Sequence, residues 1–152
     1  MNIVLVEPEI PGNTGNVGRS CVGTESTLHL VGRLGFSLDD KYLKRSGLDY
    51  WKDIDLKLHK SWDDFLGSLP KKAGLFFFEK DGSRAFWEAK FTADSYLIFG
   101  SETKGFSQKI IDSHRELFYK IPMTGKIRSL NLASAVAVAA YEAIRQVSLR
   151  RT

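Results

Sequence analysis

Three short segments of this 152-residue chain combine glycine or proline with polar side chains able to hold a ligand. The first covers residues 11–19 and carries Asn13, Asn16 and Arg19, with a glycine at every third position. This spacing matches neither the dinucleotide-binding fingerprint nor the phosphate-binding loop. A tight turn from strand to helix explains the glycines equally well. We expect Arg19 near the start of a helix, with its guanidinium within reach of a ligand beside the two asparagines.

The second segment covers residues 99–106 and follows an apolar run. Gly100 has no side chain, so a ligand is able to approach the backbone there. Glu102 is expected near the start of a helix that begins around Ser107. The alternative interpretation is a capped loop whose charged side chains are simply solvated.

The third segment covers residues 121–132 and ends in two polar residues, Ser129 and Asn131, where a long apolar run starts. In open parallel α/β sheets, ligands bind outside the carboxyl ends of the strands, and all three segments follow predicted strands. Ser129 is equally explained as the N-cap of the helix that follows.

Signatures of other chemistries are absent from the sequence. His29, His59 and His114 are scattered, without partners at metal-ligand spacing, so no metal site is expected. Cys21 is the only cysteine, which excludes a disulfide within the chain, and its neighbours favour a small core residue. No serine lies in a nucleophile elbow.

The segments are positioned by an alternation of strands and helices, which predicts one α/β domain over residues 1–152 with a mostly parallel sheet. Residues 7–12 contain two prolines and a glycine and are expected to interrupt any strand or helix. Strands are predicted at residues 2–6, 28–31, 55–59 (at an edge), 74–78, 95–99 and 117–121. Helices are predicted over residues 16–23, 41–46 and 130–147, after Ser61 and after Ser107.

The composition favours a folded protein in a reducing compartment, which we expect to be the cytoplasm. Hydrophobic residues make up 43% of the chain, enough to fill a core. Lys and Arg exceed Asp and Glu by 22 to 18, and this net charge of +4 suits nucleic acid or an ordinary surface. No apolar run is long enough to span a bilayer.

Together the three segments resemble the signature motifs of the SPOUT class of RNA methyltransferases. The similarity is greatest to the small tRNA (cytidine/uridine 2′-O)-methyltransferases of the anticodon wobble position. It is carried, in order, by residues 7–16 with Arg19, 35–36, 39–41, 46–50, 99–105, 121–123 and 128–132. The chain departs from the pattern at Gly18 and Gly23, which make the first helix flexible, and at residues 133–134, where Ser-Asn is expected.

The resemblance implies an α/β fold with a C-terminal trefoil knot, in which the chain after Phe99 threads a loop. It also implies that S-adenosylmethionine is the methyl donor, held at Phe78, Gly100, Ile121 and Ser129. The family further implies a homodimer whose two subunits share each active site, and a tRNA anticodon stem-loop as substrate.

Methyl transfer to a ribose hydroxyl needs aligned reactants and removal of one proton, and it needs no metal. The resemblance assigns Arg19 to the RNA phosphate or to the attacking hydroxyl. Because a guanidinium stays protonated, we interpret Arg19 as an orienting group, with an RNA phosphate or water accepting the proton. The matching polar positions that hold the ribose, the arginine and the methionine moiety are Asn13, Glu102, Ser129 and Asn131.

Two other functions stay open at the level of sequence. One is 2′-O-methylation of rRNA or of another tRNA position, although larger relatives with those targets carry an additional RNA-binding domain. The other is a non-catalytic RNA-binding protein of the same fold. The joint presence of Arg19, Glu102, Ser129 and Asn131 argues against it. A nucleotide-dependent oxidoreductase lacks its glycine fingerprint here.

Overall fold

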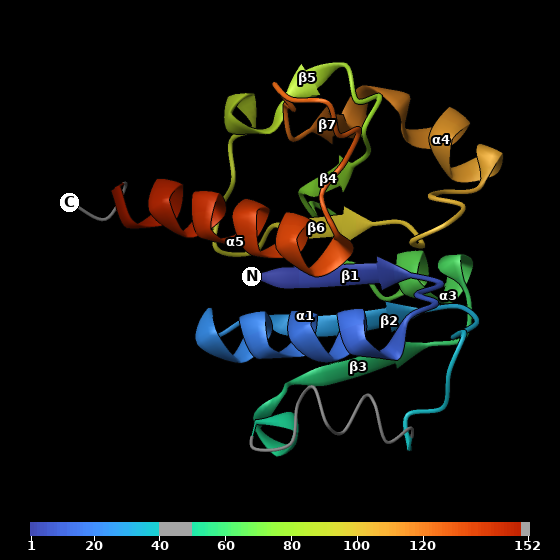
Figure 1. Ribbon diagram of the computed structural model, residues 1–152. Coiled ribbons are helices and arrows are strands. Elements are labelled where there is room, and N and C mark those ends of the chain that lie inside the picture. Colours follow the sequence, from blue (N-terminus) through green and yellow to red (C-terminus); the bar gives the residue numbers. More distant parts are fainter. Residues whose placement is uncertain (40–49, 150–152) are drawn as a thin grey trace.

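The computed structural model describes residues 1–39 and 50–149 and is built around one seven-stranded sheet (Figure 1). The strands lie in the order β3-β2-β1-β6-β4-β7-β5, and each neighbouring pair is parallel. Their bounds are Asn2–Val6 (β1), Thr27–Val31 (β2), Leu56–His59 (β3), Leu75–Phe78 (β4), Arg84–Ala85 (β5), Tyr96–Phe99 (β6) and Phe118–Lys120 (β7). The predicted α/β fold with a parallel sheet is confirmed, and the trefoil knot stays a prediction.

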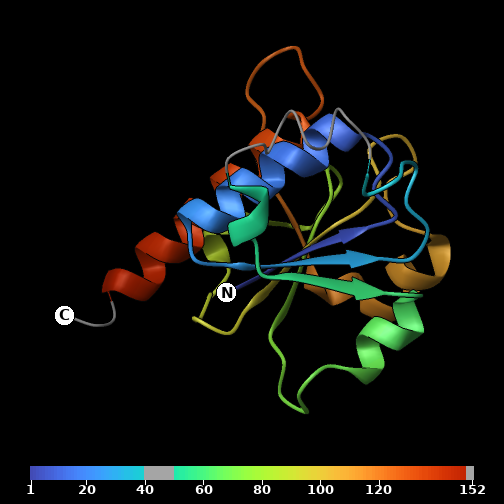
Figure 2. The ribbon, with the colours of Figure 1, turned by 90° about the horizontal axis from the view of Figure 1, so that it is seen from below.

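Helices cover both faces of the sheet (Figure 2). Helices α1 (Pro11–Gly23) and α5 (Leu132–Leu149) lie on one face, and α3 (Trp62–Gly67) and α4 (Gln108–His114) lie on the other. Short 3₁₀ helices occur at Trp51–Asp53 (η1), Phe86–Glu88 (η2) and Arg115–Leu117 (η3). None of the helices in the described ranges is long and apolar enough to cross a membrane.

The two faces of the sheet bury two separate apolar clusters, which explains the continuous aromatic run of β4. Phe78 belongs to the cluster beneath α1 and α5, whereas Phe77 belongs to the cluster beneath α3 and α4. Successive side chains of a strand point to opposite faces, so a strand covered on both sides is apolar throughout.

Most of the predicted elements are confirmed to within two residues. The strand at residues 56–59 lies at the edge of the sheet as expected. Ser61 caps α3, since its hydroxyl accepts a hydrogen bond from the Asp64 amide at 3.1 Å. The two-residue strand β5 was not predicted, because so short a run has no periodicity to detect. The helix predicted over residues 41–46 lies outside the described residues.

Helix α1 begins earlier than predicted, at Pro11 rather than near Asn16. The expectation that residues 7–12 interrupt any helix is therefore wrong for its last two residues. Proline fits the first position of a helix, where its fixed φ is already helical and its missing N–H has no partner to lose. The earlier start places Asn13 in the first turn and moves Arg19 into the second half of the helix.

Two histidines, the buried His29 and the half-buried His59, form a pair beside α3. The His29 Nδ1 lies 3.0 Å from the His59 Nε2, and the His29 Nε2 lies 3.2 Å from the Asn2 Oδ1. Because the asparagine oxygen only accepts, His29 carries its proton on Nε2 and accepts one from His59. Only 3% of His29 is exposed, and this burial lowers its pKa to about 4.

We predict that the protein loses stability as the pH falls from about 6.5 to about 4. In this window the unfolded chain binds a proton at residue 29 that the folded chain excludes, so stability rises with pH. The loss attributable to His29 reaches about 3 kcal/mol at most, at ~1.4 kcal/mol per unit of pKa shift. Urea unfolding at pH 7.5, 5.5 and 4.5 measures the free energy of unfolding across this window. His29→Gln is expected to flatten the pH dependence, and His114→Gln is the control; equal slopes for wild type and His29→Gln would contradict this account.

Candidate active site

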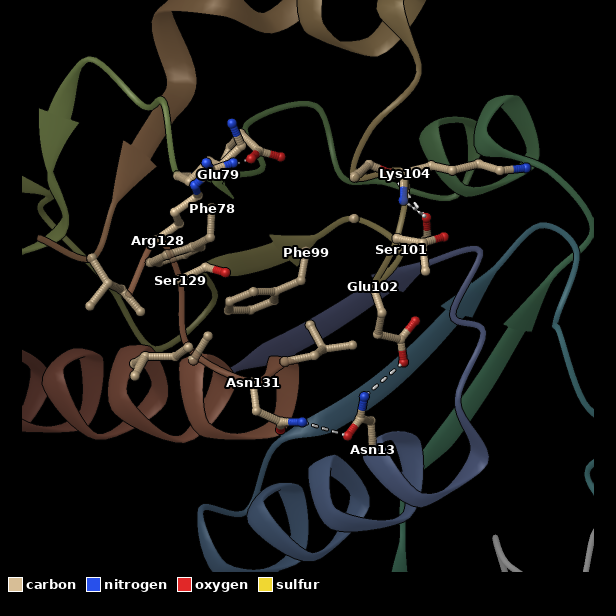
Figure 3. Close-up of a pocket in the computed structure, with 18 of the residues that line it drawn as sticks. Asn13, Phe78, Glu79, Phe99, Ser101, Glu102, Lys104, Arg128, Ser129 and Asn131 are labelled. Atoms are coloured by element: carbon tan, nitrogen blue, oxygen red, sulfur yellow. Dashed lines mark hydrogen bonds between the residues drawn. The ribbon is translucent and has the colours of Figure 1, made fainter. Parts of the chain in front are cut away.

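A cavity of about 430 Å³ opens at the carboxyl ends of β4, β6 and β7 (Figure 3). It brings together the three segments identified in the sequence. Asn13 comes from the first turn of α1, Glu102 from the loop after β6, and Ser129 and Asn131 from the segment that precedes α5. Its size is typical of a pocket for a small molecule.

A tight turn after β6 displays Glu102. Ser101 and Gly105 exchange two backbone hydrogen bonds, of 3.1 and 3.0 Å, across the turn. Gly105 has a φ of 64°, which favours glycine, and a Cβ added at Gly100 would lie 2.5 Å from the Gly105 carbonyl carbon. Gly100 lines the cavity as expected, but the turn itself, independently of any ligand, already requires a glycine there.

The Glu102 carboxylate lies at the N-terminus of α1. It accepts hydrogen bonds from the Glu9 amide at 2.7 Å and from the Ile10 amide at 3.1 Å. The expectation that Glu102 lies near the helix after Ser107 is wrong. The two amides belong to the residues that directly precede α1, and the helix dipole is positive at this end, so a carboxylate from another segment stabilises it.

Asn13 connects Glu102 to the third segment. The Asn13 Nδ2 donates to the Glu102 carboxylate at 3.1 Å, and the Asn13 Oδ1 accepts from the Asn131 Nδ2 at 2.9 Å (Figure 3). The Asn131 Oδ1 accepts from the Ala133 amide at 2.9 Å, so Asn131 caps α5 and Ser129 does not. The alternative interpretation of Ser129 as an N-cap is therefore wrong.

A second link between the first two segments was missed in the sequence. The Thr103 amide and hydroxyl both donate to the Glu9 carboxylate, at 2.9 and 2.6 Å. These hydrogen bonds lower the pKa of Glu9. Thr103 adjoins Glu102 in the motif, but nothing in the sequence indicates which loop Glu9 would meet. Together with the Glu102 bonds, this link holds the loop before α1 against the turn after β6.

The opposite wall of the cavity is apolar and aromatic. The rings of Phe78 and Phe99 stack with centroids 4.7 Å apart, beside Ile121. Residues 122–130 make no backbone-to-backbone hydrogen bond with the described part of the chain. Ser129 points its hydroxyl toward the cavity (Figure 3). An apolar slot edged by free peptide groups suits a flat heteroaromatic ring with hydrogen-bonding edges.

The cavity is also lined by three cations, Lys80, Lys104 and Arg128. A hydrogen bond to Asp81 raises the pKa of Lys80, which keeps that ammonium charged. Cations around a pocket favour an anionic ligand such as a nucleic-acid backbone. Across residues 1–39 and 50–149, no group of three or more histidine, cysteine or acidic side chains is placed to hold a metal ion.

Arg19 does not line this cavity. It lies six residues beyond Asn13 on α1, which corresponds to about 9 Å along the axis and to a different face of the helix. The expectation that Arg19 lies at a helix start is therefore wrong. Arg19 is exposed, and its guanidinium carbon lies 5.4 Å from the centre of the Tyr50 ring.

Known proteins are similar to this chain over nearly its whole length. A tRNA (cytidine(34)-2′-O)-methyltransferase of Burkholderia pseudomallei is 44% identical over 147 residues, covering 95% of this chain and 94% of its own. A structure described as giving insights into the 2-OH methylation of C/U34 on tRNA superposes with a TM-score of 0.93 at 48% identity, covering 98% of this chain and 97% of that one.

A more distant structure shows the same fold. The SpoU methyltransferase AviRb from Streptomyces viridochromogenes, solved in complex with the cofactor AdoMet, superposes with a TM-score of 0.86 at 24% identity. The match covers 96% of this chain and 57% of that one. Residues 1–141 match the SpoU rRNA Methylase family, and the chain belongs to that family.

Proposed function

We propose that the protein transfers a methyl group from S-adenosylmethionine to the ribose 2′-hydroxyl of the wobble nucleotide in tRNA anticodons. The observation that carries the proposal is the cavity in which Asn13, Glu102, Ser129 and Asn131 converge, in a chain similar over nearly its whole length to a wobble-position methyltransferase. The cations at the cavity support an RNA substrate.

The residues of the apolar wall fit S-adenosylmethionine. Phe78 and Ile121 supply apolar surface, Gly100 exposes backbone, and Ser129 offers a hydroxyl at the edge of the slot. The unpaired peptide groups of residues 122–130 are free to bond the edges of an adenine ring. When bound, the cofactor supplies an activated methyl group on a sulfonium centre.

The contribution of this chain is alignment of the reactants. The hydrogen bonds from Glu102 through Asn13 to Asn131 fix the three segments relative to one another, so the ribose and the methyl donor bind to a rigid site. Glu102 and Ser129 face the cavity and orient the substrates. The hydroxyl proton passes to an RNA phosphate or to water, because the Arg19 guanidinium stays protonated.

Arg19 is proposed to act on the cavity of a second copy of the chain. It lies outside the cavity of its own chain, and its side chain is exposed. Helix α5, which packs against α1, exposes 40% of Val138 and 57% of Tyr141, side chains that a partner would cover. A symmetric dimer that uses this surface would bring Arg19 of each copy to the site of the other.

Incubation with methyl-labelled S-adenosylmethionine and tRNA lacking the wobble modification tests the function. Nuclease digestion and nucleoside mass spectrometry should detect 2′-O-methylcytidine or a 2′-O-methyluridine derivative at position 34. A tRNA with a 2′-deoxynucleotide at that position is the control, since it lacks the hydroxyl. Methylation of rRNA or of another tRNA nucleotide would replace the proposed target, and cofactor binding without any transfer would favour a non-catalytic RNA-binding protein.

We predict that Glu102→Gln lowers kcat at least ~10-fold, because an amide disturbs the alignment that the carboxylate maintains. Its stability should fall by about 1–2 kcal/mol, since the N-terminus of α1 loses a charged acceptor. Steady-state methylation and urea unfolding measure the two effects. Glu116→Gln, an exposed carboxylate elsewhere, is the control. Full activity in Glu102→Gln would show that the Glu102 carboxylate is not needed to align the reactants.

We predict that Arg19→Ala lowers kcat at least ~10²-fold through lost alignment and charge stabilisation. If each site takes Arg19 from the other subunit, mixing Arg19→Ala with Glu102→Gln creates one intact site per mixed dimer. Random exchange of subunits then restores about a quarter of wild-type activity. No recovery after verified subunit exchange would show that Arg19 serves its own chain or neither.

A further inference from the structure

Arg19 has an aromatic neighbour, Tyr50, which has no role in the proposed function described above. Its guanidinium carbon lies 5.4 Å from the centre of the Tyr50 ring, inside the ~6 Å range of a cation–π contact. No carboxylate in residues 1–39 or 50–149 forms an ion pair with Arg19. Among the described residues, the tyrosine ring is therefore the group that holds this cation.

The segment that follows Tyr50 packs against the helix that carries Arg19. The 3₁₀ helix η1 follows Tyr50 directly and lies against α1. A Cβ added at Gly18 would lie 2.5 Å from the Ile54 Cδ1 and 3.3 Å from the Trp51 Cζ3. The sequence suggested that Gly18 makes the helix flexible, but in the structure Gly18 allows η1 to pack closely against α1. This close packing places the Tyr50 ring next to Arg19.

The ring of Tyr50, rather than its hydroxyl, makes this contact. The Tyr50 hydroxyl is buried and has no hydrogen-bond partner within residues 1–39 and 50–149. A buried hydroxyl without a partner gives no stabilisation and has a desolvation cost. Phenylalanine at position 50 would keep the aromatic face without this cost.

We propose that Tyr50 is a positioning residue for Arg19. A free arginine side chain samples many rotamers, and ordering it for each turnover has an entropic cost. The ring confines the guanidinium before RNA binds, so less ordering remains at the moment of reaction. This role rests on the proposed function of Arg19 in methylation of the wobble ribose.

The test compares Tyr50→Phe with Tyr50→Leu, which retains apolar bulk but no ring. The Arg19 Nε–H proton is expected to resonate upfield in wild type and Tyr50→Phe, from the ring current, and to lose this shift in Tyr50→Leu. The kcat should be kept in Tyr50→Phe and fall about 2- to 5-fold in Tyr50→Leu, the range expected for a cation–π contact with an exposed cation. Affinity for S-adenosylmethionine should not change.

Combining Tyr50→Leu with Arg19→Ala separates positioning from a general loss of structure. In the Arg19→Ala background, Tyr50→Leu should cause no further loss of kcat, because no guanidinium remains to be held. Trp87→Leu, at an aromatic residue that is 57% exposed, is the control for removing a ring.

Three results would overturn the role of Tyr50 while leaving wobble methylation intact. They are full activity in Tyr50→Leu, an equal fractional loss in the Arg19→Ala background, and equal loss in Tyr50→Phe and Tyr50→Leu. The last result would assign the effect to the hydroxyl. A wild-type protein that methylates no tRNA would refute the proposed function itself, and the role of Tyr50 with it.

Discussion

The site depends on one carboxylate placed at the start of one helix. Glu102, which lies on the turn after β6, accepts two backbone hydrogen bonds just before α1 begins. Asn13 donates a hydrogen bond to Glu102 and accepts one from Asn131. The interaction is strong because it joins a charge to two backbone amides directly before the helix, at the positive end of the helix dipole. It also joins segments about 90 and 118 residues apart, so the cavity exists only when the sheet has brought β1, β6 and the start of α5 together.

The sheet and the tight turns set the precision of this arrangement. Parallel strands end at a common edge, which places the loops after β1, β4, β6 and β7 side by side. At Gly100 the backbone of the turn approaches so closely that no side chain would fit, and at Gly105 the positive φ of 64° favours glycine. The same principle operates away from the cavity at Gly18, where close packing of η1 brings Tyr50 to Arg19. In this protein, glycines therefore allow rigid segments to pack closely, in addition to any flexibility that they give the backbone.

The functional side chains divide into two groups with different surroundings. Asn13, Glu102 and Asn131 are locked in a hydrogen-bonded chain inside the cavity, whereas Arg19 is exposed on another face of α1 with an aromatic neighbour. A group that must meet RNA needs to stay accessible, and a group that shapes the cofactor pocket needs to be immobile. The separation of Arg19 from the cavity of its own chain is the physical reason that the proposed function includes a second copy of the chain.

The sequence by itself determined six of the seven strands and the parallel α/β class, because local apolar runs and turn residues carry that information. The resemblance to a family with three signature motifs, rather than any local pattern, placed the three polar segments in one site. It did not determine the start of α1, since Pro11 suits both an interruption and a first helical turn. Only the tertiary structure decided that Glu102 caps α1, that Asn131 rather than Ser129 caps α5, and that Arg19 faces Tyr50. The contacts of Glu102 and Arg19 join segments far apart in the chain, and no local pattern specifies which distant partner a polar side chain will meet. The choice between Asn131 and Ser129 depends on the residue at which α5 begins.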